Sequence, residues 1–76
     1  MKIIPIEGAY ITLGQLLKKT DIVSTGGQAK MFLAEREVKV NGQTETRRGR
    51  KLYPGDEIRL HNGVTMKIVG KSDANA

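Results

Sequence analysis

The stretch Val38-Lys39-Val40-Asn41-Gly42 marks the point where the chain changes from helical to extended structure. Apolar and polar residues alternate over residues 38–40, which is the period of a strand with one buried face. Asn-Gly directly after such a run predicts a two-residue hairpin turn, because both residues tolerate the positive φ of a type I′ turn. We therefore expect a hairpin whose returning, polar strand runs over residues 43–46.

The residues before this hairpin have the spacing of two short helices. The first helix begins with a capping-box pattern, in which Thr12 is the N-cap and Gln15 follows three residues later. Its apolar residues share one helix face, and it ends in cations that suit the negative end of the helix dipole: Leu13, Leu16 and Leu17, then Lys18 and Lys19. The second helix is capped by Ser24 or Thr25 and opens with Gly26-Gly27. Its apolar face repeats the same spacing with Ala29, Phe32 and Leu33.

The residues after the hairpin predict further strands joined by turns. Pro54 and Gly55 occupy the central positions of a type II turn over residues 53–56. Ile58 and Leu60 alternate as a strand, residues 61–63 form a turn, and a last strand covers residues 64–69. Residues 2–6 predict a short strand at a sheet edge, where Pro5 is tolerated.

These elements predict an α+β fold, with two short helices packed on a small, mostly antiparallel sheet. A chain of 76 residues holds one domain at most. We assign that domain to residues 1–70 and expect a flexible tail over residues 71–76.

The composition favours a polyanionic partner. Thirteen Lys and Arg against eight Asp and Glu give a formal charge of +5 and a pI near 9.8. Such a field attracts nucleic acid or an anionic surface. The absence of cysteine rules out disulfides and thiolate zinc sites and fits a cytoplasmic location. The first residues are too short an apolar stretch for a signal peptide, and no run approaches the ~18 apolar residues of a membrane span.

Three segments together resemble a known family: Thr12-Leu13-Gly14-Gln15-Leu16-Leu17, Ser24-Thr25-Gly26-Gly27-Gln28-Ala29, and Val38-Lys39-Val40-Asn41-Gly42. Their order is similar to the alpha-L RNA-binding motif, the domain named after ribosomal small-subunit protein S-four. Residues 53–58 look like the later Gly-Asp-x-Ile strand of that family. The run from Asn41-Gly42 through residues 47–52 to Gly55-Asp56 is especially similar to short stand-alone members of the YaaA and YbcJ type. The resemblance implies RNA binding, with ribosomal RNA or a ribosome-assembly intermediate as the target.

The chain departs from the family pattern at four positions. Family members often carry Arg at the position of Thr12, Asp at Gly14, Arg at Gly26 and Gly at Arg36. Two arginines that commonly contact RNA are therefore missing. We expect the basic run over residues 47–51 to supply the contacts instead.

The basic run and the second helix start are the candidate binding site. Residues 45–51 hold four cations and one acid, a local balance of +3. Arginine forks bind phosphates, and the released counterions drive association. The N–H groups at Gly26-Gly27 could also receive a phosphate. The predicted RNA-binding residues are Lys18, Thr25, Gly26, Gly27, Lys30, Asn41, Arg47, Arg48, Arg50 and Lys51. The simpler alternatives are a solvated loop, ordinary helix capping and a plain hairpin turn.

The few aromatic residues indicate which kind of RNA is bound. Tyr53 lies nearest the basic run, but packing beside Pro54 is the favoured account, and Phe32 has core spacing. Three aromatics do not make a stacking platform of the single-strand-binding type. We expect recognition of shaped, double-stranded or junction RNA through phosphates and 2′-hydroxyls.

No catalytic or metal site is expected. His61 is the only histidine and has neither a cysteine partner nor a nucleophile arranged with it. The acidic pairs belong to a helix end and a turn, and there is no phosphate-binding loop or dinucleotide fingerprint. We predict a monomeric binding protein that uses no cofactor, contacts no membrane and is not an enzyme.

Two alternatives come from other classes of protein. Sulfur-carrier or ubiquitin-like β-grasp proteins also show Val-x-Val-Asn-Gly and a later Gly-Asp-x-Ile. They need a Gly-Gly carboxyl terminus, whereas this sequence ends Asp73-Ala74-Asn75-Ala76, and two helices before Val38 fit that fold poorly. The other alternative is a protein–protein adaptor whose positive charge is incidental.

Overall fold

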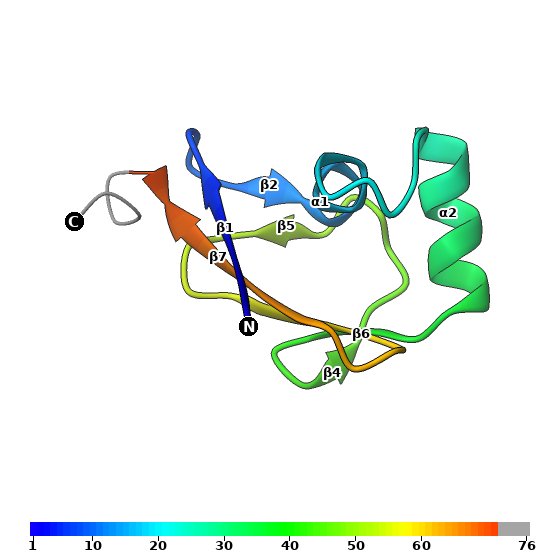
Figure 1. Ribbon diagram of the computed structural model, residues 1–76. Helices are drawn as coiled ribbons and strands as arrows, with labels where there is room; N and C mark the ends of the chain where they lie inside the picture. Colours follow the sequence, from blue (N-terminus) through cyan, green and yellow to red (C-terminus); the bar gives the residue numbers. More distant parts are fainter. Residues whose placement is uncertain (72–76) are drawn as a thin grey trace.

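A computed structural model describes residues 1–71, in which two helices pack on a five-stranded sheet with a second, two-stranded sheet beside them (Figure 1). The expected tail lies outside the described residues, except for Lys71, whose Nζ donates to Glu7 Oε1 at 2.6 Å. The elements in chain order are β1 Lys2–Ile6, β2 Ile11–Thr12, α1 Leu13–Lys19, α2 Gly26–Glu35, β3 Val38–Val40, β4 Gln43–Thr44, β5 Lys51–Leu52, β6 Glu57–Leu60 and β7 Thr65–Gly70.

The main sheet has the strand order β1-β7-β6-β3-β4. Its β1–β7 pair is parallel and its other pairs are antiparallel, which confirms the mostly antiparallel α+β architecture. Pro5 lies on the edge strand β1, as expected, because proline lacks the N–H that a central strand needs.

The hairpin between β3 and β4 has the predicted turn. Asn41 and Gly42 both have positive φ, 52° and 85°. The returning strand is shorter than the expected residues 43–46. Glu45 N–H still donates to Val38 O at 2.8 Å, but the next two N–H groups, of Thr46 and Arg47, donate to the Glu45 carboxylate instead of to β3. The chain therefore leaves the sheet at Glu45.

Both helix starts are capped by threonine. Thr12 accepts from Gln15 N–H at 3.2 Å, and its own N–H donates to Gln15 Oε1 at 3.0 Å, so the capping box is confirmed. In α2 the cap is Thr25, which accepts from Gln28 N–H at 3.1 Å. Each cap satisfies backbone donors that have no partner inside the helix.

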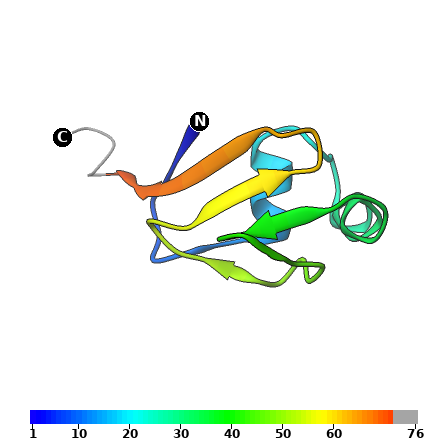
Figure 2. The same cartoon turned by 90° about the horizontal axis from the view of Figure 1, so that it is seen from below.

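The core lies between the helices and one face of the main sheet. Figure 2 shows α1 behind the strands and α2 beside the end of the sheet. Alternate residues of the central strands point to this core, and α1 contributes three leucines that are fully buried. The core includes Leu13, Leu16, Leu17, Ala29, Leu33, Val38, Val40, Ile58, Leu60, Met66 and Ile68. Phe32, expected in the core, is only partly buried and packs edge-on against His61, with ring centroids 5.9 Å apart.

The two-stranded sheet formed by β2 and β5 has no counterpart in the expected elements. It is antiparallel, with Ile11 opposite Leu52 and Thr12 opposite Lys51. Two residues per strand are too few to show a periodic pattern, which is why the sequence alone does not indicate them. Thr12 is both the last residue of β2 and the cap of α1. Because it pairs with Lys51, the end of the basic run lies directly beside the start of that helix.

No helix within residues 1–71 is long and apolar enough to span a membrane.

Candidate nucleic-acid interface

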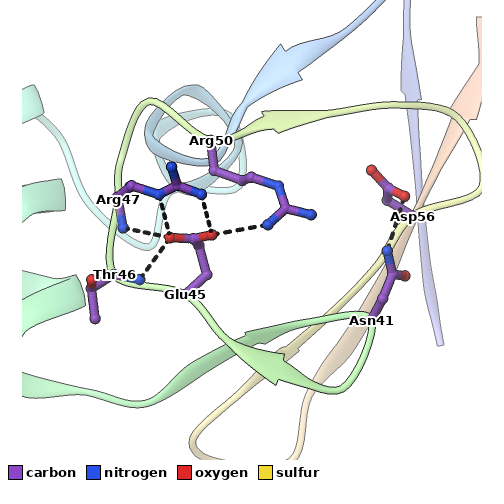
Figure 3. A network of polar contacts seen from close by, with 6 residues as sticks. All are labelled: Asn41, Glu45, Thr46, Arg47, Arg50 and Asp56. Atoms are coloured by element: carbon purple, nitrogen blue, oxygen red, sulfur yellow. Dashed lines mark hydrogen bonds and ion pairs between the residues drawn. The ribbon is translucent and has the colours of Figure 1, made fainter.

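Glu45 organises the loop that carries the basic run. Only 8% of this residue is exposed, and its carboxylate accepts hydrogen bonds from two side chains and two backbone N–H groups (Figure 3). Oε1 accepts from Arg47 Nε at 3.1 Å and from the N–H groups of Thr46 and Arg47. Oε2 accepts from Arg47 Nη2 at 3.2 Å and from Arg50 Nη1 at 2.9 Å. The bidentate Arg47 pair fixes the orientation of that guanidinium.

These contacts keep Glu45 ionised. The side-chain hydrogen bond from Arg47, then its backbone N–H, and then Arg50 outweigh the cost of burial and lower the pKa of Glu45 from 4.5 to about 2. The same contact raises the pKa of Arg47. Glu45 therefore neutralises part of the positive charge expected from the run, and it holds two arginines in place.

The loop docks on the first turn of α1. Leu13 N–H donates to Arg50 O at 2.9 Å, and Gly14 N–H donates to Arg48 O at 2.8 Å. The free N–H groups of this helix start are thus used by the loop backbone. Gly14 permits the approach, because a Cβ there would lie 3.3 Å from both Arg48 Cβ and Arg48 O.

Arg48 connects the loop to the start of α2. Its Nη1 donates to Gly26 O at 3.2 Å, across 22 residues of sequence. A Cβ on Gly26 would lie 3.2 Å from the same nitrogen, so the absence of a side chain makes room for the guanidinium. A depression of about 220 Å³ lies at this junction, lined by Thr12, Gly14, Gln15, Lys18, Gly26, Arg48 and Gly49.

The first turn of α2 keeps unused donors. Within the part of the chain that the structure describes, the N–H groups of Gly26 and Gly27 have no acceptor. The Thr25 hydroxyl is the helix cap, and Gln28 Oε1 accepts from Ser24 N–H at 2.6 Å. This helix start, unlike that of α1, therefore still offers backbone donors beside Arg48.

Lys51 and Tyr53 extend this surface on the far side of the loop. They line a second depression of about 510 Å³ together with Arg47, Gly49 and Arg50. Lys51 Nζ lies 4.8 Å from the centroid of the Tyr10 ring, and the Tyr10 and Tyr53 rings are 5.8 Å apart. Tyr53 thus packs against Tyr10, whereas the sequence predicted packing beside Pro54.

The structure groups most of the predicted residues, but not all of them. Lys18 joins Gly26 and Arg48 in the smaller depression. Lys30 is exposed on α2 and lines neither depression. Asn41 lies apart, beyond Arg50, as Figure 3 shows. Its side-chain amide donates to Asp56 Oδ1 at 3.0 Å and its oxygen accepts from Glu57 N–H at 2.9 Å, so these groups tie the hairpin to the turn before β6.

Glu45 and Tyr10 shape this surface, and neither is among the residues that the sequence predicts to bind RNA. The sequence carries only a weak signal for Glu45, because one acid beside four cations indicates a lowered local net charge and not a buried carboxylate. Tyr10 precedes a strand of only two residues, so nothing in the sequence places it opposite Tyr53. No group of His, Cys, Asp or Glu side chains within residues 1–71 is arranged to hold a metal ion.

Comparison with known proteins identifies the family. A family model described as the S4 domain matches residues 4–69, which is most of the chain. The chain belongs to the S4 domain family. This result confirms the resemblance to the alpha-L RNA-binding motif and favours it over the β-grasp alternative. The probable ribosome maturation protein RlbA of Bacillus subtilis (strain 168) is 47% identical over 66 residues, covering 87% of this chain and 93% of that protein. The matched S4 region contains the whole surface described above.

Proposed function

We propose that this protein binds structured RNA through the surface formed by the basic loop, the start of α2 and Lys18. The observation that carries the proposal is the contact from Arg48 to Gly26, which brings a guanidinium beside unused backbone donors from a distant part of the chain. Both kinds of donor suit phosphate oxygens. Lys51, Arg47 and Arg50 continue the positive surface on the other side of the loop.

We further propose ribosomal RNA, or an assembly intermediate of the ribosome, as the target. The support is the similarity to the B. subtilis protein, which is named a probable ribosome maturation protein. A protein that acts on assembling ribosomal particles would be located in the cytoplasm, and we propose that location here.

The proposed role is binding without catalysis. An S4 domain with a preformed, open basic surface supports docking of a shaped ligand, because the arginines are already oriented and little side-chain freedom is lost on binding.

Substitution of surface cations that form no ion pair within residues 1–71 tests the proposal. We expect the triple variant Lys18→Gln, Arg48→Gln and Lys51→Gln to weaken binding of ribosomal RNA fragments by at least about tenfold, since each lost phosphate contact also loses counterion release. Arg47 and Arg50 are poor choices, because their replacement exposes the buried Glu45 carboxylate and disturbs the loop. Filter binding or fluorescence anisotropy gives the affinity.

The control variant removes cations from the other side of the molecule. Arg59→Gln with Lys67→Gln lowers the charge on the solvent face of β6 and β7, away from the core-facing Ile58 and Met66. We expect it to bind almost as tightly as the wild type. Equal losses in both variants would refute the proposed surface. Binding to a protein partner that is insensitive to salt would favour the adaptor alternative instead.

A further inference from the structure

Two of the three aromatic residues meet on the surface next to the basic loop. Tyr10 and Tyr53 are 43% and 49% exposed, and their rings lie 5.8 Å apart at an interplanar angle of 51°. The register of the small sheet explains the contact. Ile11 pairs with Leu52, so the residues just outside that pair, Tyr10 and Tyr53, face each other across the strands.

Strand alternation places these rings on the same side as a cation. Leu52 is fully buried and Ile11 is partly buried against the core, so their neighbours point outward. Lys51 and Tyr53 project from β5 and its end, and Tyr10 and Thr12 project from the β2 side. Lys51 Nζ lies 4.8 Å above the Tyr10 ring. Thr12 also lines the depression of Gly26 and Arg48, so one continuous surface joins the tyrosines to the basic residues.

Packing of the two rings on each other explains only part of this arrangement. A cross-strand aromatic pair stabilises a small sheet. It does not account for rings that remain about half exposed beside a cation. Large aromatic faces exposed beside cations are the arrangement that receives nucleobases.

We infer that the Tyr10–Tyr53 pair stacks on an unpaired base of the bound RNA. Tyr53 lines the same depression as Arg47, Arg50 and Lys51. A nucleotide seated there would place its base on an aromatic face and its phosphate near the cations. The inference rests on the proposed function and extends it from recognition of shaped RNA to preference for RNA with an exposed base.

The tyrosines themselves report on the binding event. The chain has two tyrosines and no tryptophan, so its intrinsic fluorescence comes from this pair alone. The probes are two RNA duplexes that differ only in one inserted adenosine, which is unpaired and bulged in the second duplex. We expect the bulged duplex to quench tyrosine fluorescence more strongly and to bind at least about fivefold more tightly, the lower range for stacking of one base.

Paired variants separate stacking from stability. Tyr10→Phe with Tyr53→Phe keeps both aromatic faces, so we expect the preference for the bulged duplex to persist. Tyr10→Leu with Tyr53→Leu should bind the paired and the bulged duplex with equal affinity, with folding checked by circular dichroism. If the double leucine variant does not fold, the fluorescence measurement on the wild type still decides the question.

The outcomes distinguish this inference from the proposed function. Equal affinity of the wild type for both duplexes, or equal quenching by both, would overturn the stacking inference and leave RNA binding intact. A leucine variant that keeps the preference would also overturn it. Failure of the wild type to bind either duplex or ribosomal RNA would overturn the proposed function, and the stacking inference with it.

Discussion

At the scale of single residues, Glu45 decides how the basic loop is presented. An arginine cluster without an acid would repel itself and sample many rotamers. The buried carboxylate binds Arg47 in a bidentate manner and Arg50 through one nitrogen, and it also receives two backbone N–H groups. Within residues 1–71, most N–H donors of these two guanidinium groups make no hydrogen bond to the protein. Glu45 thus cancels part of the positive charge of the loop and fixes two arginine side chains. Side chains that are already ordered lose less conformational entropy when a ligand binds.

Replacement of this carboxylate should destabilise the fold. We expect Glu45→Gln to lower the free energy of unfolding by about 2 kcal/mol, because an amide cannot accept the charged contacts of both arginines. Urea denaturation measures the change. Glu37→Gln is the matched control, since Glu37 makes only an exposed contact with Lys39 at 3.7 Å and should change stability by less than about 0.5 kcal/mol. Equal effects of both substitutions would contradict the role given to Glu45.

The lowered pKa of Glu45 predicts a pH dependence of stability. The pKa is about 2 in the folded protein and 4.5 ordinarily, so the unfolded state takes up the proton first. The stabilisation is complete above pH 4.5 and is lost as the pH falls from 4.5 to 2. We expect the difference in unfolding free energy between wild type and Glu45→Gln to shrink across this window. A difference that stays constant down to pH 2 would argue against a lowered pKa of Glu45.

At the scale of elements, the interface depends on a loop that docks on a helix start. Helix α1 has only seven residues, and its first two N–H groups donate to loop carbonyls. The loop in turn holds β5 against β2 and directs Arg48 to α2. Short elements of this kind have little stability alone, so each is ordered by its neighbours.

Close contact at Gly14 should therefore be essential to this arrangement. We expect Gly14→Val to destabilise the protein by about 1–3 kcal/mol, because its side chain would collide with the Arg48 backbone and push the loop away. Gly49→Val, in the loop that Gly14 contacts, is the control, since a Cβ there would meet nothing within 4 Å. Thermal or urea denaturation compares the two. A Gly14 variant as stable as the Gly49 variant would show that the loop does not need this close approach.

At the scale of the whole molecule, positive charge is present on more than one side. Lys39, Arg59 and Lys67 project from the main sheet away from the core, and Lys39 lies directly opposite Arg59. Charge by itself therefore does not locate the binding surface. The candidate interface differs from the sheet face because it adds unused helix N–H groups, oriented arginines and exposed rings to its cations.

Salt dependence should show which cations meet phosphate. For RNA binding, log K should fall by about 0.7–0.9 per phosphate contact for each tenfold rise in salt. We expect the triple variant at Lys18, Arg48 and Lys51 to have a slope about 2–3 units shallower than the wild type. The variant at Arg59 and Lys67 should keep the wild-type slope. Anisotropy titrations at several salt concentrations test this, and unchanged slopes in both variants would contradict phosphate contact at either surface.

Local patterns in the sequence determined the main elements and the family. Helical spacing of leucines, threonine caps and Asn-Gly after an alternating run act over a few neighbouring residues, and the structure contains each of them where expected. The order of these elements also indicated the S4 domain, which the family match confirms. Their physical causes are short-range, so one sequence was enough to read them.

Only the tertiary structure decided how the site is assembled. The bond from Arg48 to Gly26, the pairing of Tyr10 with Tyr53 and the burial of Glu45 join residues whose neighbours in sequence give no sign of the contact. Each depends on how the loop closes over α1, which is set by packing and by hydrogen bonds between distant segments. The sequence by itself determined that cations are present; the folded chain decided which of them are neutralised, which stay free and which aromatic faces lie beside them.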